Sequence, residues 1–393
     1  MVLNESATSR EGGDISKAKI SSKPLALNDP INAFSFKLYH VIKRYYGNDN
    51  MFYSPIGIIY TFSMLMLGAN DQSELEVFYG LHLNESFASP QDAHIAFRSL
   101  LKVIERKANY SIDLANIILI QKNERFLKEF TKRLGSFYKV TIGEVDFLKN
   151  GMRVMKEINE WVAQNTHNKI KQLLKEPLDP LTRLVILNAV YFKGHWKYGF
   201  DSLSSTTGKF YNQGKTPKDA TFMHNIEKFG YFEDPVKKYQ LLELKYSGEA
   251  SFLIVLPKEK DGLNEIVRTV EIKEILRPLE EKEVQISMPK FKLESEYDLK
   301  KVLPELGIKA IFGPGADLSG ISGDKTLFVS SGIHKSMIEV NEEGTEAASA
   351  TGVVVATRNY KPIPVVNVDH PFIFIIRDTK YDLIYFMGRL NVL

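Results

Sequence analysis

The chain has 393 residues, enough for a large hydrophobic core and too many for one simple bundle or sandwich. Its formal net charge is only +3, so a polyanion site would have to be a local patch, and we expect no nucleic-acid partner. The sequence contains no cysteine, which excludes disulfide frameworks, thiolate metal sites and cysteine nucleophiles.

Residues 1 to about 30 are polar and predict an extension ahead of a single domain over residues 31–393. This extension lacks the hydrophobic core of a signal peptide, which fits either a cytosolic protein or the mature form of a secreted one. Three Asn-x-Ser sequons, at Asn4, Asn84 and Asn109, favour secretion weakly and are candidate N-glycosylation sites. We therefore expect an extracellular protein. We expect no membrane segment either, because the apolar run Ile56–Leu67 is shorter than the ~20 residues that span a bilayer.

Helices are predicted to dominate the first half of the chain and strands the second. Apolar residues recur at helical spacing from Ile31, a buried helix follows Pro55, and a further helix covers Ala93–Ala108. Ile112–Gln121 predicts a strand, and the sequence after Pro180 is rich in strand-forming runs, with one helix around Leu299–Leu306 and a final hairpin around Asp378–Lys380. This order indicates one mixed α+β domain rather than alternating βαβ units.

The motifs of common enzyme classes are missing from the sequence. There is no G-x-S-x-G nucleophile elbow and no H-E-x-x-H metal motif, and the eight histidines are scattered. The segment Gly313–Gly320 contains Gly-x-Gly but follows a helix and lacks the third glycine of a dinucleotide loop, so it predicts a turn. These absences disfavour an enzyme and a metal site. By motif alone, Ser54, Asn188 and His334 are interpreted as buried hydrogen-bonding groups.

A basic stripe runs along the predicted helix of residues 93–108. Arg98, Lys102 and Arg106 recur every four residues and share one face, with Lys107 beside them. A solvated outer face and a site for a heparin-like sulfated polysaccharide, acting as an activator, are the two interpretations. Glu105 interrupts the cluster and weakens the second one.

Several ordered segments resemble one protein family. They are MFYSPIGIIYTFSMLMLGA from Met51, NAVYFKGHW from Asn188, MPKFKLE from Met288, LGIKAIFGPGADLSGIS from Leu306, IHKSMIEVNEEGTEAA from Ile333, and DHPFIFIIRD with YFMGR near the C-terminus. On these segments the chain is identified as similar to the serpins, inhibitors of serine proteases, over residues 31–393. The resemblance implies an α+β fold with three β-sheets, eight or nine helices and an exposed reactive loop at about residues 342–364.

The resemblance assigns roles to buried residues. Ser54, Asn188 and His334 match the family's shutter, a buried hydrogen-bonded cluster that governs whether strands of the central sheet part. Trp196 matches the tryptophan of the breach, where the reactive loop first enters the sheet. The chain departs from the family at Gly57, where a serine is common.

Residues 342–351 match the hinge of the reactive loop. When the loop becomes a strand, alternate side chains face the core, and a charge or proline there would oppose insertion. The core-facing set Thr345, Ala347, Ser349 and Thr351 is small and uncharged, which favours an inhibitor over non-inhibitory carriers, chaperones or storage proteins. The complete hinge is Glu342, Glu343, Gly344, Thr345, Glu346, Ala347, Ala348, Ser349, Ala350 and Thr351.

Arg358 is the only basic residue between Gly344 and Tyr360, and the family's usual spacing from Glu342 places the cleaved bond at Arg358–Asn359. Arginine fits the acidic primary pocket of trypsin-like proteases, whereas cleavage at Thr357 or a valine would indicate elastase-like targets. The resemblance implies a monomeric suicide substrate that traps its protease covalently, with no catalytic residue of its own, no metal and no required cofactor. It also implies a role in an extracellular cascade such as clotting or invertebrate immunity. A non-inhibitory serpin that acts as a binding protein remains the alternative.

Overall fold

The computed structural model describes residues 4–5, 26–104, 110–345 and 363–393. Its central sheet runs in the order β1, β4, β3, β5, β12, β11, and β13 pairs with one end of β5. The strands are β1 (Asn4–Glu5), β3 (Tyr110–Gln121), β4 (Thr141–Val145), β5 (Leu184–His195), β11 (Phe291–Asp298), β12 (Val329–Val340) and β13 (Gly344–Thr345).

A second sheet is built mainly from the second half of the chain, in the order β14, β10, β7, β8, β9, β15, β16, β2, with β6 beside β7. Its strands are β2 (Met51–Tyr53), β6 (Thr206–Asn212), β7 (Thr216–Asp234), β8 (Tyr239–Lys245), β9 (Ala250–Pro257), β10 (Glu280–Pro289), β14 (Val365–Asn367), β15 (Phe372–Asp378) and β16 (Leu383–Leu390).

The α+β fold is confirmed, but the described residues form two hydrogen-bonded sheets rather than the expected three. The reason is the length of β7, which has 19 residues. Its first part pairs with β6, its middle part with β10 and its last part with β8, so one continuous strand joins what would otherwise be two sheets.

Ten α-helices lie in the described residues, where eight or nine were expected, and three of the ten have only four residues. They are α1 (Asn28–Tyr46), α2 (Pro55–Met66), α3 (Asp71–Gly80), α4 (Pro90–Ile104), α5 (Lys128–Phe137), α6 (Phe147–Asn165), α7 (Leu263–Thr269), α8 (Ile272–Ile275), α9 (Leu299–Val302) and α10 (Ser319–Ser322). In this part of the chain, no helix combines the length and the apolar character needed to cross a bilayer.

The buried helix predicted after Pro55 is confirmed as α2, all of whose residues are buried. Proline suits the first turn of a helix, and the Ser54 side chain caps this one by accepting a hydrogen bond from the backbone N–H of Gly57. The C-terminal hairpin is likewise confirmed as β15 and β16. The helix predicted over residues 93–108 begins earlier, at Pro90, and is described as far as Ile104.

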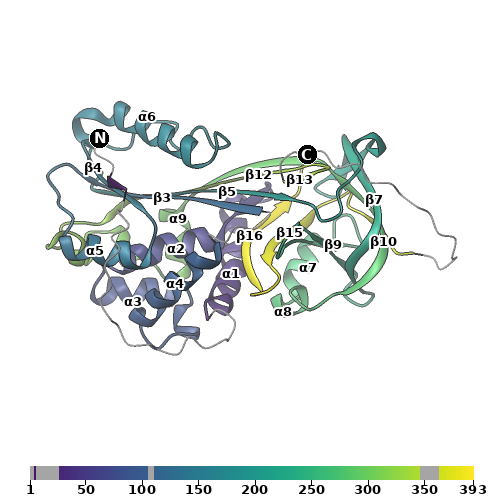
Figure 1. The fold of residues 1–393 in the computed structure, drawn as a ribbon, viewed down its shortest axis with the longest axis horizontal. Coiled ribbons are helices and arrows are strands. Elements are labelled where there is room, and N and C mark those ends of the chain that lie inside the picture. Colours follow the sequence, from purple (N-terminus) through teal and green to yellow (C-terminus); the bar gives the residue numbers. More distant parts are fainter. Residues whose placement is uncertain (1–3, 6–25, 105–109, 346–362) are drawn as a thin grey trace.

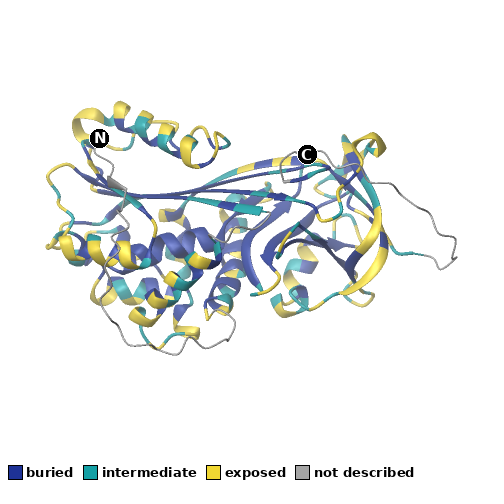
Figure 2. Ribbon diagram, viewed as in Figure 1, coloured by how far each residue is buried: buried dark blue, intermediate teal, exposed yellow. Residues whose placement is uncertain are grey.

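The central sheet lies between two different layers (Figures 1 and 2). Helix α6 covers one face, and the other helices of the first half and the second sheet lie on the opposite side. Strand β5 is buried on both faces: Leu184, Ile186 and Val190 join the main core, whereas Val185, Leu187, Ala189 and Tyr191 join a smaller core under α6. Such two-sided burial is expected of a strand with parallel pairing in the interior of a sheet.

Candidate functional site at the seam of the central sheet

The site is the seam between β5 and β12, where a reactive loop would have to enter. The two strands pair directly and in parallel, from Val329 opposite Leu184 to Met337 opposite Tyr191. Beyond this point β12 no longer pairs with β5. There β13 pairs antiparallel with the C-terminal end of β5, with Gly344 opposite His195 and Thr345 opposite Gly194. The seam is therefore closed along most of its length, and of the hinge residues that the structure describes, Gly344 and Thr345 pair with β5 at its open end.

The three predicted shutter residues form one buried, hydrogen-bonded cluster behind the closed part of the seam. His334 on β12 lies directly opposite Asn188 on β5, with 2.6 Å between His334 Nδ1 and Asn188 Oδ1. The backbone N–H of Ser54 donates to His334 Nε2 at 3.0 Å, and the Ser54 hydroxyl donates to the Tyr385 carbonyl at 2.9 Å. The cluster thus bridges both strands and the start of α2.

These contacts fix the protonation state of His334. Because Nε2 accepts from Ser54, Nδ1 must carry the proton that is donated to Asn188, which makes the ring neutral. Burial lowers the pKa of His334 from 6.5 to about 3, in agreement with this tautomer. A protonated ring would lose its bond from Ser54 in a site where all three side chains are fully buried.

The sequence did not identify a further member of this cluster. Asn188 Nδ2 donates to Asn116 Oδ1 on β3 at 2.6 Å, and the Thr61 hydroxyl on α2 lies 2.8 Å from the same oxygen. The network therefore reaches across β3, β5, β12 and α2. Asn116 lies inside the apolar strand sequence DLANIILI, and a buried amide in such a run is the signal that would have pointed to it.

Gly57, the departure from the family pattern, has a structural reason. A Cβ at this position would lie 2.8 Å from Asn188 Oδ1, 2.9 Å from Val190 Cγ2 and 3.2 Å from Ser54 Oγ. Glycine therefore allows Asn188 to approach α2 closely, and a serine here would require the cluster to rearrange.

At the open end, Trp196 lies where the hinge joins β5. Its indole ring stacks on Tyr246 with centroids 4.5 Å apart, and its Nε1–H donates to the Asn341 carbonyl at 2.9 Å. The Trp196 backbone N–H also donates to the Glu343 carbonyl at 3.0 Å. The tryptophan thus holds the strand end and the turn before the hinge together.

Glu342 anchors the base of the hinge. Its carboxylate accepts from the Lys290 ammonium at 2.9 and 3.0 Å and from the Ser205 hydroxyl at 2.8 Å, and its side chain is only 9% exposed. Burial acts to raise the pKa of Glu342, but the bonds from Lys290 and Ser205 outweigh burial and lower the pKa. Lys290 and Ser205 were missed by sequence reasoning, because nothing local in the sequence relates them to Glu342.

Among the hinge residues that the structure describes, Gly344 is the position whose backbone requires glycine. Its φ is +142°, and an added Cβ would lie 2.8 Å from the Cα of His195 and in severe overlap with the Gly194 carbonyl oxygen. The close approach lets the chain turn directly into antiparallel pairing with β5.

On the α6 side, Lys335 ties β12 to its surroundings. Although only 4% exposed, its ammonium pairs with Glu294 of β11 at 2.7 Å and donates to the Gln172 carbonyl in the segment after α6. The segment that follows α6 is thereby fastened across the seam, and the loop would have to displace this contact if it entered.

Residues 29–392 of the chain match the family model of the serpins, described as serine protease inhibitors. The chain belongs to the serpin family. Membership of this family confirms that the protein is a protease inhibitor by descent and not an enzyme.

Curated relatives include proteins of arthropods. Iripin-5 of Ixodes ricinus is 38% identical over 87% of this chain and 88% of its own length, and Intracellular coagulation inhibitor 2 of Tachypleus tridentatus is 35% identical over 93% and 91%. Among solved structures, Serpin48, described as a highly specific serpin in the insect Tenebrio molitor, is 30% identical, covers 96% of this chain and 100% of its own, and superimposes with a TM-score of 0.85.

The remaining predicted site residues of this serpin are placed only in part. Arg98 and Lys102 lie exposed on α4, and Asn84 is exposed in a short 3₁₀ turn. The backbone of Asn4 pairs with Ile142 in β4. The hinge residues Glu346–Thr351, the predicted bond Arg358–Asn359, the basic residues Arg106 and Lys107, and the sequon at Asn109 lie outside the described residues, so these predictions stay predictions.

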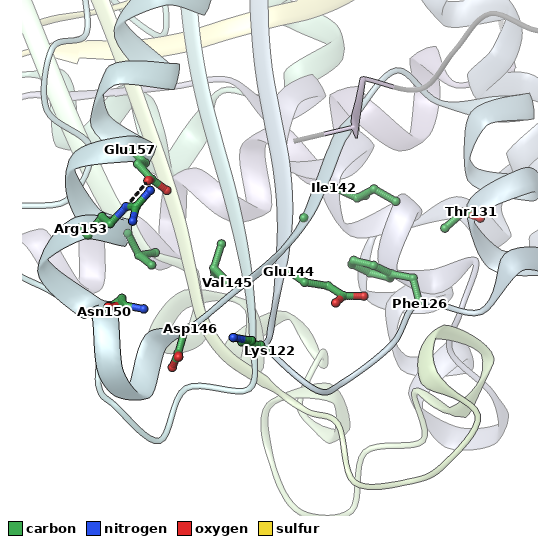
Figure 3. A pocket seen from close by; sticks show the side chains of 12 residues that line it. Lys122, Phe126, Thr131, Ile142, Glu144, Val145, Asp146, Asn150, Arg153 and Glu157 are labelled. Atoms are coloured by element: carbon green, nitrogen blue, oxygen red, sulfur yellow. Dashed lines mark hydrogen bonds and ion pairs between the residues drawn. The ribbon is translucent and has the colours of Figure 1, made fainter. Parts of the chain in front are cut away.

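A pocket of ≈ 620 Å³ lies away from the seam of the serpin, between α5, β4 and α6 (Figure 3). Its walls carry both charges, including the Arg153–Glu157 pair of α6 at 2.8 Å. None of the predicted site residues lines it. In the described part of the chain, no group of three or more His, Asp or Glu side chains is arranged to hold a metal ion.

Proposed function

We propose that this serpin inhibits trypsin-like serine proteases by offering Arg358–Asn359 as bait. The observation that carries the proposal is the solitary basic residue: Arg358 is the only one between Gly344 and Tyr360. An arginine side chain forms a charge-assisted, two-pronged contact with the carboxylate in the primary pocket of trypsin-like proteases.

The length of β5 supports the position of this bond. Strand β13 pairs with β5 in a register that matches Gly344 with His195 and Thr345 with Gly194. If this register continued toward the N-terminal end of β5, it would place Val355 opposite Leu184, the first residue of β5. The loop segment before Arg358 is therefore as long as the strand that it would have to cover.

The same register predicts which loop side chains would be buried. Residues directly opposite each other in antiparallel strands share a face. Thr345, Ala347, Ser349 and Thr351 would accompany the β5 residues Gly194, Phe192, Val190 and Asn188, on the face of the main core. All four are small and uncharged, so burying them incurs no charge-desolvation penalty. The one charged residue, Glu346, would lie on the other face, across from Lys193.

The mechanism follows the chemistry of serine proteases until deacylation. The protease serine attacks the Arg358 carbonyl, the bond to Asn359 breaks, and Asn359 leaves as a free amine after accepting a proton from the protease histidine. The protease remains esterified to Arg358. The freed segment then enters the seam as a new strand, and the gain of a strand supplies the energy that displaces and deforms the tethered protease.

The setting is proposed from the relatives. One of them is named as an intracellular coagulation inhibitor and others come from a tick, which supports a regulator of a protease cascade in clotting or immunity; that the cascade is extracellular is part of the proposal. The three sequons are compatible with a secreted glycoprotein. Elastase-like specificity through Thr357 or a valine, and a non-inhibitory binding role, are the outcomes against which the proposal is tested.

Incubation with trypsin, followed by a denaturing gel and mass spectrometry, tests the proposal. We expect a covalent complex together with a released peptide that begins at Asn359. Arg358→Ala should abolish the complex, and Lys361→Ala, which removes the next basic residue, should leave it intact. Cleavage without a complex would contradict the inhibitory role, and a complex joined at another residue would contradict the assigned bond.

A heparin-like polysaccharide is proposed as an activator, supported by the exposure of Arg98 and Lys102 one turn apart on α4. Heparin should then accelerate protease trapping, less so at high salt. Charge reversal at Lys102 together with Arg106 should abolish the acceleration, whereas Lys132→Glu on the exposed side of α5 should not. Trapping at the same rate with and without heparin would eliminate this site.

A further inference from the structure

Arg389, near the end of β16, is buried with most of its hydrogen-bond donors unused. The side chain is 2% exposed, and within the described residues only one of its three nitrogens forms hydrogen bonds. This nitrogen, Nη2, donates to the carbonyl oxygens of Gly47 at 2.7 Å and Asp49 at 2.6 Å. A guanidinium carries five N–H donors, so the donors on Nε and Nη1 have no partner in this part of the chain. Such unpaired donors are costly in a protein interior.

No carboxylate balances the charge of Arg389. None of the described Asp or Glu side chains forms an ion pair with it, and both of its hydrogen-bond acceptors are neutral carbonyls. The nearby Tyr39 hydroxyl is neutral as well, because burial raises its pKa more than Arg389 lowers it. A buried charge without a counter-charge costs far more than a buried neutral group. The surroundings of Arg389 therefore favour a negative charge at its side.

A cavity of ≈ 50 Å³ lies against Arg389. Its walls come from the turn after α1, the turn between β6 and β7, the start of α7, the approach to β15 and the end of β16, with Asn48, Gln213, Asn264 and Pro371 among the residues. The helix α1 and the strand β16 pack side by side here (Figure 1). One buried water needs roughly 10–15 Å³, so the cavity has room for a few waters or for one small ion.

The charged groups around the cavity make its inner end positive. Lys43 on α1 lies within electrostatic range of Arg389, because burial and then the charge of Arg389 lower the pKa of Lys43. Lys260 also lines the cavity, with Asp369 at 3.9 Å from its ammonium. The only carboxylate on the described walls is that of Asp261, which is exposed. Solvent screens an exposed charge more strongly than a buried one, so Arg389 dominates the potential inside.

We propose that the cavity beside Arg389 binds a small monovalent anion of the size of chloride. The ion would accept hydrogen bonds from the unpaired guanidinium donors and would supply the missing counter-charge. Water could accept the same hydrogen bonds, but it would leave the charge unbalanced. Because Nη2 of Arg389 already ties the turn after α1 to β16, the bound ion would stabilise this junction of the native fold. The inference does not depend on which protease the serpin inhibits.

Thermal unfolding of the full-length serpin tests the anion site. When chloride replaces gluconate at pH 7 and constant ionic strength, the unfolding midpoint should rise by about 2 °C and saturate, with half of the rise below about 0.15 M chloride. Asn264→Asp places a carboxylate on the cavity wall but keeps the oxygen that accepts from Lys43 at 2.6 Å, so it should fold and lose the chloride effect. Asn84→Asp, the same change at an exposed position outside the cavity, is the matched control and should respond as wild type does.

Crystals grown in bromide would locate the ion directly, because bromide scatters anomalously. We expect one anomalous peak within hydrogen-bonding distance of Arg389 in the wild type and no peak there in Asn264→Asp. An unfolding midpoint that is equal in gluconate and chloride, or that rises without saturation, would overturn the anion site. A chloride effect that survives in Asn264→Asp would place the ion elsewhere, and a cavity without bromide would assign the donors to water; either result also overturns it.

Discussion

The two ends of the seam between β5 and β12 are held by different chemistry. At the closed end, the shutter residues Ser54, Asn188 and His334 are fully buried and neutral. They are joined by hydrogen bonds in which the neutral His334 ring donates to Asn188 and accepts from Ser54. At the open end, Glu342 and Lys290 form an ion pair at the rim, and the lysine side chain is 41% exposed. A buried neutral network costs much to disrupt, whereas a pair near solvent can exchange its partner for water.

This difference gives the seam a direction. The hinge already pairs with β5 at the open end, so a loop that inserts advances toward the shutter and breaks one β5–β12 pair after another. The bond between His334 and Asn188 would be reached midway along β5. We infer that the open end admits the loop and that the shutter resists spontaneous insertion.

Removing the central amide of the shutter should have the largest effect. Asn188→Leu leaves the His334 Nδ1–H without its partner in a dry site, which costs about 1–3 kcal/mol, and it also removes the hydrogen bond from Asn188 to Asn116 Oδ1, which keeps only its contact with Thr61. We expect the free energy of unfolding to fall by about 3–4 kcal/mol in denaturant titrations. Asn84→Leu, the same change at an exposed position, should stay within about 0.5 kcal/mol. If both variants lost the same free energy of unfolding, the shutter would not be the more strongly held end of the seam.

Acidification should weaken the shutter without any mutation. The folded-state pKa of His334 is lowered to about 3, so below its unfolded value of 6.5 the unfolded chain binds a proton that the native ring does not. Stability from this group is complete above pH 6.5 and is lost as pH falls, by about 2 kcal/mol at pH 5. His94, whose pKa burial also lowers to about 3, should contribute a similar loss.

The variant His94→Gln separates the two histidines, because His94 lies on α4, where it bonds to the Tyr138 hydroxyl, and not at the seam. Denaturant midpoints between pH 7 and 5 should then show about half of the original pH dependence. If the slope in this variant were flat, the His334 ring would not be neutral and buried in the native protein.

The hinge glycine should show an intermediate effect. Gly344→Ala places a Cβ against the backbone of Gly194 and His195 at a φ of +142°, which we expect to cost about 1–2 kcal/mol and to release β13 from β5. Hydrogen exchange at the end of β5 reports the release directly. Gly323→Ala, at a φ of +97° with its nearest contact at 3.5 Å, is the control for backbone strain alone. Slower exchange in Gly344→Ala would contradict the role of glycine at this position.

The sequence predicted the fold largely because ordered segments such as Asn188–Trp196 carry a family pattern. It also predicted that Ser54, Asn188 and His334 are buried hydrogen-bonding groups, because polar residues in apolar runs must find partners. It could not identify Lys290 and Ser205 as the partners of Glu342, since 52 and 137 positions separate them from it. Such pairings follow from the strand order, which local patterns do not encode.

Other differences arise from backbone geometry rather than side-chain chemistry. The sheet count depends on how far β7 continues, and no residue in the run from Thr216 to Asp234 forces it to end. Gly57 was noted only as a departure from the family pattern, because its closeness to Asn188 and Val190 exists only once α2 and β5 are packed. Arg358 lies outside the described residues, so its assignment as bait is left to the trypsin experiment.

The smallest expected effect is at the open end. Glu342→Gln keeps an acceptor for Ser205 but removes the charge that pairs with Lys290, which should cost about 1 kcal/mol because the lysine is partly exposed. Asp219→Asn, which breaks the exposed Lys209–Asp219 pair at 2.8 Å, should cost at most about 0.5 kcal/mol. Because the pKa of Glu342 is lowered, its contribution is present above about pH 4.5 and is lost as pH falls further. Unfolding midpoints at low and high salt, at pH 7 and pH 4, therefore test whether the open end depends on charge. A loss for Glu342→Gln as large as that for Asn188→Leu would mean that both ends of the seam resist opening equally.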